Sequence, residues 1–179
     1  MFTHLAKITN TLDLVVNNAG VYFSSFIEHY PLDKVLYTFK VNIIAPFYIT
    51  QLAIPFLIKS KTPHIINISS RLGKEKVVDK SSAYAASKAA LIQLTKCSAL
   101  EFRKYKIRVN AVCPGFTNTD MNKPVIKNQK KLDKISQNIP MGRIAETQDI
   151  ANVISFLASD KSSYINGESI GVNGGSILI

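Results

Sequence analysis

Short apolar runs alternate along this chain with longer helix-like segments, and this alternation restricts the fold more than any other feature. The apolar runs cover residues 12–16, 64–68, 108–113 and 169–172. The helix-like segments between them cover residues 42–60, 83–105 and 147–158. Short, continuous apolar runs are typical of strands buried on both faces, and strands alternating with helices form a parallel sheet. We therefore predict an α/β fold with a doubly wound parallel sheet.

The chain is long enough to form one domain with its own core. It has 179 residues, of which 46% are hydrophobic, and no linker or repeat divides it. The most apolar stretch, residues 43–58, is shorter than the ~20 residues that a bilayer requires and contains Pro46 and Pro55. We interpret it as a helix buried on two faces, by its own sheet and by a partner subunit, and predict no membrane span.

The cysteines and the N-terminus favour a cytoplasmic protein. Cys97 and Cys113 each lie in an apolar segment without a CxxC motif, as is typical of reduced core residues. The first ten residues show neither the apolar core nor the cleavage site of a signal peptide. The three histidines have no ligand spacing, so we predict no metal site.

The net charge of +10 raises the question of an acidic partner. The only dense basic run covers residues 123–134, and it lacks the aromatic side chains on which bases stack. We predict that this run is a solvated face or a mobile loop, which could attract an acidic substrate or carrier. A nucleic-acid binder is the third hypothesis, and salt-sensitive retention on DNA or RNA would test it.

The most specific chemical signal is the pair Tyr84 and Lys88. We expect a helix over residues 83–105, with Ser81 and Ser82 as candidate N-caps. Positions four residues apart lie on one helical face, so the phenol and the ammonium emerge side by side. A nearby cation favours the ionised phenol, which would let the tyrosine exchange protons near neutral pH.

Other polar residues follow the carboxyl ends of the expected strands. Ser70 follows the second strand, Pro114 and Gly115 follow the third, and residues 17–20 follow the first. In open α/β sheets the ligand crevice lies outside these strand ends. We therefore expect the three strand ends and the Tyr84 helix to line one crevice.

In type and order, these motifs match those of the short-chain dehydrogenase/reductase family, which the chain resembles over essentially its whole length. The matching motifs are NNAG at 17–20, the asparagine of VNIIAPF at Asn42, NISS at 67–70, YAASK at 84–88, NAVCPG at 110–115 and INGESIGVNGG at 165–175. The ISSR, YAASK and PGFTNTDM segments look most like the carbonyl reductase and 3-oxoacyl-[acyl-carrier-protein] reductase branch. The resemblance implies a Rossmann-like sheet and hydride transfer between NAD or NADP and a small carbonyl or alcohol substrate.

The resemblance also implies a role for each catalytic residue. Tyr84 would be the general acid or base, and Lys88 would lower its pKa and bind the nicotinamide ribose. Ser70 would hold the substrate oxygen; it is preferred to Ser69 because Gly73 follows three residues later, as in the family. Asn42 would anchor a water that connects Lys88 to solvent.

A larger set of residues would contact the cofactor. Thr119 is expected to hydrogen-bond the carboxamide of the nicotinamide. The expected cofactor-binding residues are Asn17, Ala19, Gly20, Tyr84, Lys88, Pro114, Gly115, Thr117 and Thr119.

The glycine-rich strand–turn–helix that opens the family's fold has no counterpart here. Glycines 171, 174 and 175 lie within or after the last expected strand with no helix after them, so they form no phosphate loop. We expect an incomplete Rossmann-like fold that lacks its first βαβαβ portion, either truncated or incomplete as a gene model. The choice between NAD and NADP is then unreadable, and the strand at 12–16 becomes a bare apolar edge.

Two hypotheses of different classes follow. The first is an NAD(P)-dependent oxidoreductase that forms a homo-oligomer, a dimer or a tetramer, through the helices at 42–60 and 83–105, as the family usually does. The alternative is a non-catalytic remnant of the family that acts, if at all, through oligomerisation. The substrate, the reaction direction and the oligomer size are not encoded in any motif that we identified.

Overall fold

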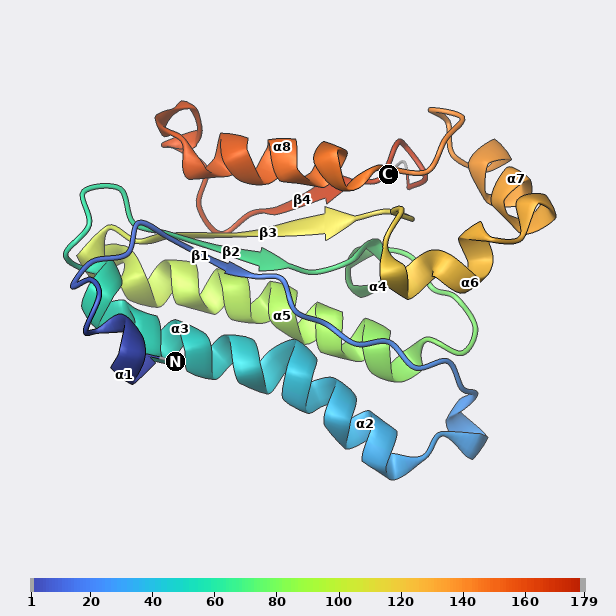
Figure 1. Ribbon diagram of the computed structural model, residues 1–179, viewed down its shortest axis with the longest axis horizontal. Coiled ribbons are helices and arrows are strands. Elements are labelled where there is room, and N and C mark those ends of the chain that lie inside the picture. Colours follow the sequence, from blue (N-terminus) through green and yellow to red (C-terminus); the bar gives the residue numbers. More distant parts are fainter. Residues whose placement is uncertain (1, 178–179) are drawn as a thin grey trace.

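Four parallel strands form the centre of the protein. The computed structural model describes residues 2–177, and Figure 1 shows the sheet between two layers of helices. Neighbouring strands are parallel throughout, in the order β1-β2-β3-β4. The strands are β1 (Leu14–Asn17), β2 (His64–Ile68), β3 (Arg108–Pro114) and β4 (Ser169–Val172). The predicted parallel α/β architecture is confirmed, and each strand lies within one or two residues of its predicted bounds.

Helices connect the strands and cover both faces of the sheet. The α-helices are α1 (Phe2–Leu5), α2 (Leu32–Phe39), α3 (Ala45–Leu57), α4 (Arg71–Lys74), α5 (Ser82–Glu101), α6 (Lys123–Ile126), α7 (Gln129–Gln137) and α8 (Thr147–Ala158). A π-helical segment, η2 (Lys40–Ile44), joins α2 to α3. The 3-10 turns are η1 (Ile27–His29), η3 (Phe102–Tyr105), η4 (Asp120–Asn122) and η5 (Asp160–Ser162).

The lysine-rich segment was predicted as a solvated face or a mobile loop, and the structure shows the solvated face. It folds into α6 and α7, and neither helix contains a buried residue. The side chain of Asn128 caps α7 by accepting a hydrogen bond of 3.1 Å from the backbone N–H of Lys131. The expected solvated face is therefore correct, but it is helical rather than irregular.

The core is divided by the sheet. On one face, α3 and α5 contribute Leu57 and Ala99 to a cluster that includes Ile65 of β2. On the other face, α8 contributes Leu157 to a cluster that includes Ile66 of β2. Successive side chains of a strand point to opposite faces, and every residue of β2 is buried. This two-sided burial is why the strand reads as an uninterrupted apolar run.

A chain of polar side chains crosses the face covered by α3 and α5. Asn17 of β1 donates from Nδ2 to Asn67 Oδ1 at 2.8 Å and to Thr50 Oγ1 of α3 at 3.4 Å. Asn67 in turn donates to Thr95 Oγ1 of α5 at 2.8 Å. These bonds join two strands to two helices inside the core, so they favour one register of β1 against β2.

Residues Leu32–Leu57 form one continuous helix with a π-helical middle. Among the described residues it is the one helix long and apolar enough, by length and composition alone, to cross a membrane. It is longer than the stretch at 42–60 predicted as a helix because it begins at Leu32. Its residues Ala53 and Leu57 are fully buried against the sheet, but only 28% of its most apolar stretch is buried within the described structure.

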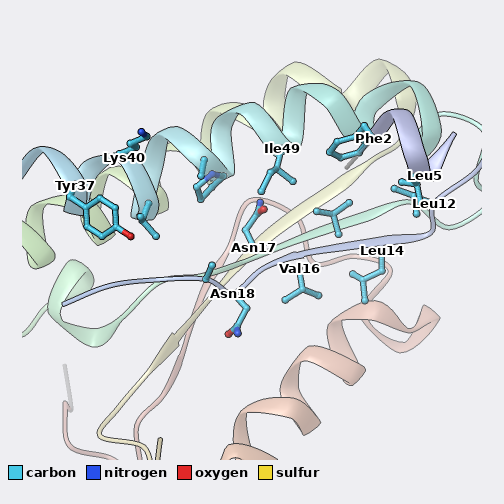
Figure 2. A pocket seen from close by; sticks show the side chains of 15 residues that line it. Phe2, Leu5, Leu12, Leu14, Val16, Asn17, Asn18, Tyr37, Lys40 and Ile49 are labelled. Carbon is cyan, nitrogen blue, oxygen red and sulfur yellow. The ribbon is translucent and has the colours of Figure 1, made fainter. Parts of the chain in front are cut away.

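β1 is an edge strand of the described sheet, as predicted. Beside it lies an apolar pocket of about 520 Å³, shown in Figure 2 between α3, α1 and the strand. The labelled side chains of Phe2, Leu5, Leu12 and Ile49 surround this pocket, and Val16 of the strand is 37% exposed. The expectation of a bare apolar edge is therefore confirmed for the described residues.

Candidate active site

A cleft of about 1240 Å³ lies at the carboxyl ends of the strands. It is bounded by the segment after β1, the end of β2, one face of α5, the segment after β3 and one side of α8. Of the residues expected in the site, the cleft is lined by Ala19, Gly20, Ser70, Tyr84, Lys88, Pro114, Gly115, Thr117 and Thr119. The convergence of three strand ends on one crevice is thus present in the structure.

Lys88 is held close to Tyr84 at the base of the cleft. Its Nζ lies 5.7 Å from the centroid of the Tyr84 ring and donates to the carbonyl oxygen of Ile68 at 2.8 Å. The side chain is only 3% exposed, and this burial lowers the pKa of Lys88 to about 8. A Cβ at Gly20 would lie 3.2 Å from this Nζ, so a glycine there leaves room for the ammonium group.

The pKa of Tyr84 moves in the direction opposite to the one expected. Burial raises the pKa of the phenol, while a hydrogen bond with the side chain of Ser70 acts in the other direction. Lys88 is itself desolvated and donates to a backbone carbonyl, so its effect on Tyr84 does not dominate. The expected lowering is therefore not found in the protein by itself.

Ser69 and Ser70 have different surroundings. The hydroxyl of Ser69 is buried and donates to the carbonyl oxygen of Lys88 at 2.8 Å. Ser70 lines the cleft, and its Oγ accepts from the backbone N–H of Leu72 at 3.1 Å as the N-cap of α4. The Ser70 hydroxyl therefore faces both the Tyr84 side chain and the cleft, whereas the O–H of Ser69 is occupied by a backbone carbonyl.

Gly73 permits α4 to lie directly against α5. A Cβ at Gly73 would lie 2.5 Å from the carbonyl carbon of Lys88 and 2.6 Å from the backbone nitrogen of Ala89. Only glycine allows this approach, which positions Ser70 beside the Tyr84 helix.

Asn42 lies behind the cleft wall rather than in it. It is fully buried in η2, and it accepts from the backbone N–H of Val21 at 2.8 Å and donates to the Val21 carbonyl at 3.0 Å. Its remaining N–H reaches Ser87 Oγ at 3.0 Å, and Ser87 donates to the Tyr84 carbonyl at 2.7 Å. Asn42 thus connects the segment after β1 to the helix of Tyr84.

The segment after β3 forms the opposite wall. The backbone N–H of Gly115 donates to the Val172 carbonyl at 2.8 Å, and a Cβ at Gly115 would lie 2.8 Å from Asn173 Cα. Thr117 is buried and donates from Oγ1 to the Gly115 carbonyl at 3.2 Å. Thr119 Oγ1 lies 3.5 Å from the Thr117 carbonyl, a long bond that leaves this hydroxyl available to a ligand.

One predicted cofactor-binding residue lies outside the cleft, and two residues that were not predicted line it. Asn17 lines the edge pocket of Figure 2 rather than the cleft, and its buried Oδ1 has no hydrogen-bond partner among the described residues. Sequence reasoning missed the apolar side of α8, where Ile150 and Ile154 line the cleft. The apolar side of α8 thus serves both the core, through Leu157, and the cleft, through Ile150 and Ile154.

Within residues 2–177, no three or more histidine, cysteine, aspartate or glutamate side chains are grouped as metal ligands would be.

Comparisons with known proteins identify the family to which this chain belongs. A family model described as "Enoyl-(Acyl carrier protein) reductase" matches residues 1–176. A 3-oxoacyl-[acyl-carrier-protein] reductase of Thermotoga maritima is 37% identical over 93% of this chain and 67% of its own length. A human (3R)-3-hydroxyacyl-CoA dehydrogenase is 42% identical over 92% of this chain and 62% of its own length.

A solved structure is similar over the whole fold. The Pseudomonas aeruginosa RhlG/NADP active-site complex has 30% sequence identity and a TM-score of 0.94, and the match covers 99% of this chain and 71% of that one. The predicted Rossmann-like sheet is thereby confirmed, and the chain spans about two thirds of the length of the curated relatives that it matches. With a matching family model over nearly every residue and relatives above 35% identity, the chain belongs to the short-chain dehydrogenase/reductase family, in the branch of the 3-oxoacyl-[acyl-carrier-protein] reductases.

Proposed function

We propose that this protein is an NAD(P)-dependent oxidoreductase that transfers a hydride between nicotinamide and a carbonyl or alcohol carbon. The observation that carries the proposal is the grouping of Tyr84, Lys88 and Ser70 around one cleft. The substrate class that we favour is a 3-oxoacyl or 3-hydroxyacyl thioester, because both curated relatives are named for such substrates.

The cleft residues fit the nicotinamide end of the cofactor. A Cβ at Gly20 would lie 3.2 Å from Lys88 Nζ, and a Cβ at Gly115 would lie 2.8 Å from Asn173 Cα. Glycine at these two positions therefore leaves room for the lysine side chain and for the segment after β4. Lys88 has three N–H donors and gives one to Ile68, which leaves two for a ribose hydroxyl and for Tyr84. We assign Thr117 and Thr119 to the wall that faces the nicotinamide, with the Thr119 hydroxyl at its carboxamide. When bound, the nicotinamide supplies or accepts the hydride.

The residues of this chain handle the proton and the developing charge. Ser70 donates its O–H to the substrate oxygen, in place of the Tyr84 side chain, and stabilises the charge that grows there. Tyr84 gives its proton to that oxygen in reduction and takes it back in oxidation. Because the pKa of Lys88 is about 8, this side chain is mostly protonated at neutral pH and favours the phenolate that reduction leaves behind.

Asn42 serves as a positioning residue in this proposal. Both of its N–H donors and its carbonyl oxygen are engaged with Val21 and Ser87. Any water in a proton relay would therefore use the second lone pair of Oδ1 or the Asn42 main chain.

Calorimetric titration with NADH and, separately, NADPH tests the proposal. We expect saturable micromolar binding to one or both cofactors, weakened about 10- to 100-fold in Lys88→Ala by the loss of a charged hydrogen bond. The matched control is Lys96→Ala, on the exposed side of the same helix, which should bind as the wild type does. A folded chain that binds neither cofactor would contradict the proposal.

Turnover gives the second arm of this test. A 3-oxoacyl thioester is added to the protein together with NADH or NADPH, whichever binds, and oxidation of the reduced nicotinamide is followed by absorbance. Tyr84→Phe should keep cofactor affinity and lose turnover, since it removes only the exchangeable proton. Equal turnover of Tyr84→Phe and the wild type would remove Tyr84 from the mechanism.

We also propose that the protein forms a homo-oligomer, a dimer or a tetramer, through α3 and α5. Large apolar side chains are exposed on and next to these helices: Ile44, the last residue of η2, is 60% exposed, Phe47 and Tyr48 of α3 are 56% and 57% exposed, and Leu100 of α5 is 62% exposed. Exposed large apolar side chains on neighbouring helices are consistent with a subunit interface. This surface is also the observation that favours the alternative, a non-catalytic member of the family that acts through oligomerisation. Such a protein would assemble without binding NADH or NADPH.

We place the protein in the cytoplasm because both cysteines are free thiols; Cys113 is buried as predicted, whereas Cys97 is exposed rather than a core residue.

A further inference from the structure

A second tyrosine, Tyr22, packs against the proposed catalytic tyrosine. The ring centroids of Tyr22 and Tyr84 are 5.3 Å apart, and the rings meet at 87° in an edge-to-face arrangement. This geometry is one that aromatic pairs prefer, because the positive edge of one ring meets the negative face of the other. Tyr22 comes from the segment that follows β1, far in sequence from the helix of Tyr84.

The segment that carries Tyr22 is fixed on both sides of that residue. On one side, Asn42 binds both the N–H and the carbonyl of Val21, at 2.8 and 3.0 Å. On the other side, the hydroxyl of Tyr30 donates to the carbonyl of Phe23 at 2.7 Å. A side chain between two anchored residues has little freedom to move away from its partner.

The contact occupies one side of the Tyr84 ring. The Nζ of Lys88, from the same helix, lies 5.7 Å from the ring centroid, and the Ser70 side chain, just after β2, hydrogen-bonds the Tyr84 side chain. The titratable groups that the structure brings against Tyr84 are thus Lys88 and Tyr22. Burial and the proximity of Tyr22 both raise the pKa of the Tyr84 phenol.

We infer that Tyr22 is a positioning residue for Tyr84: its ring fixes the orientation of the Tyr84 ring and excludes water from that side of it. The consequence for turnover rests on the proposed function, because it requires Tyr84 to be the proton donor. A displacement of about 1 Å in a reacting group can lower a rate by about 100-fold. The contact itself can be measured without any turnover.

The experiment compares Tyr22→Ala, Tyr22→Phe and a control, Tyr37→Ala, in the full chain. Tyr37 of α2 packs against Phe23 at 6.3 Å, so its removal disturbs the same segment without removing a ring from Tyr84. The first readout is the pKa of Tyr84 from NMR titration of ¹³C-labelled tyrosine, with its signal assigned by its loss in Tyr84→Phe. The second readout is kcat and KM for thioester reduction.

In Tyr22→Ala we expect the pKa of Tyr84 to fall, because water reaches the phenol, and kcat to fall about 10- to 100-fold with little change in cofactor affinity. Tyr22→Phe should keep the ring contact and stay within about 3-fold of the wild-type kcat. Tyr37→Ala should change neither quantity.

An unchanged pKa of Tyr84 in Tyr22→Ala would overturn the inference, as would an equal fall in Tyr37→Ala. If the wild type shows no turnover while the pKa shift appears in Tyr22→Ala alone, the contact is supported and the proposed function fails.

Discussion

The lysine at the base of the cleft is expected to destabilise the fold that it serves. Lys88 is 3% exposed, and the pKa of its ammonium group falls from 10.5 to about 8. Each pKa unit corresponds to about 1.4 kcal/mol, so keeping this group charged in the folded state costs about 3 kcal/mol at pH 7. Replacing it by Met, which has a similar length and no charge, removes that cost.

The substitution also has an unfavourable effect. It leaves the Ile68 carbonyl without the donor that now lies 2.8 Å away, at a cost of about 1 to 3 kcal/mol. We therefore expect Lys88→Met to raise the free energy of unfolding by about 1 kcal/mol at pH 7, while it weakens cofactor binding.

The difference in free energy of unfolding between Lys88→Met and the wild type should change sign with pH. Because the folded pKa of Lys88 lies below the unfolded one, the unfolded state binds more protons between pH 8 and 10.5, and wild-type stability gains from this group as pH rises through that window. At pH 10.5 the lysine is neutral in the folded state and half protonated in the unfolded state, so little of the charge cost remains and the lost hydrogen bond dominates the difference. Lys88→Met should then be the less stable protein.

Urea unfolding followed by circular dichroism at pH 7 and at pH 10.5 measures both differences. Lys96→Met, at an exposed position of the same helix, should stay within about 0.5 kcal/mol of the wild type at both values. A Lys88→Met variant that is destabilised equally at pH 7 and pH 10.5 would refute the reasoning, since the charge would then carry no cost.

Three further predictions follow from packing, burial and exposure. Gly73→Ala places a Cβ 2.5 Å from the backbone of Lys88, so α4 must move outward by about 1 Å. We expect a loss of about 2 kcal/mol and a melting temperature lower by roughly 5 °C. Gly171→Ala, where the Cβ meets only a flexible amide, serves as the control, and equal melting of the two variants would contradict the steric argument. His64 is buried, and desolvation, followed by the nearby Arg108, lowers its pKa below 6.5. As pH falls, the unfolded state therefore binds a proton at His64 before the folded state does, so stability should fall as pH drops below 6.5. Between pH 7.5 and 5 the urea midpoint of His64→Leu should change less than that of the wild type. An equal change of the two midpoints would contradict this account. Phe47→Asp puts a charge on the exposed side of α3 and should convert the oligomer to monomers in light scattering after size exclusion; a wild type that is already monomeric would contradict the proposed interface.

The strands and the main helices could be predicted because their burial is written in the chain. Residues 64–68 form an apolar run because both faces of β2 are covered, and the helix at 147–158 appears with the predicted bounds. The helices α6 and α7 could not be predicted from apolar spacing, because none of their residues is buried.

The residues of the candidate site were predicted better than their electrostatics. The positions of Ser70, Tyr84 and Lys88 follow from strand ends and helical spacing, which are local properties. The direction of the Tyr84 pKa depends on how deeply the ring is buried, and that depth is set by Tyr22 and other segments distant in sequence. A contact between residues distant in sequence produces no periodic pattern in the sequence.

The π-helical segment between α2 and α3 sets the rotational phase of the helices around it. Its wide turn, in which the Ala45 N–H reaches the Lys40 carbonyl, lets Asn42 face Val21 while Leu57 faces the sheet. One residue corresponds to about 100° of helical rotation. Deleting one residue from η2 would therefore leave the helix content almost unchanged but turn either the amide away from the cleft wall or the leucine out of the core. The widened turn thus lets a single helix meet two angular requirements that a regular α-helix of this sequence could not meet together.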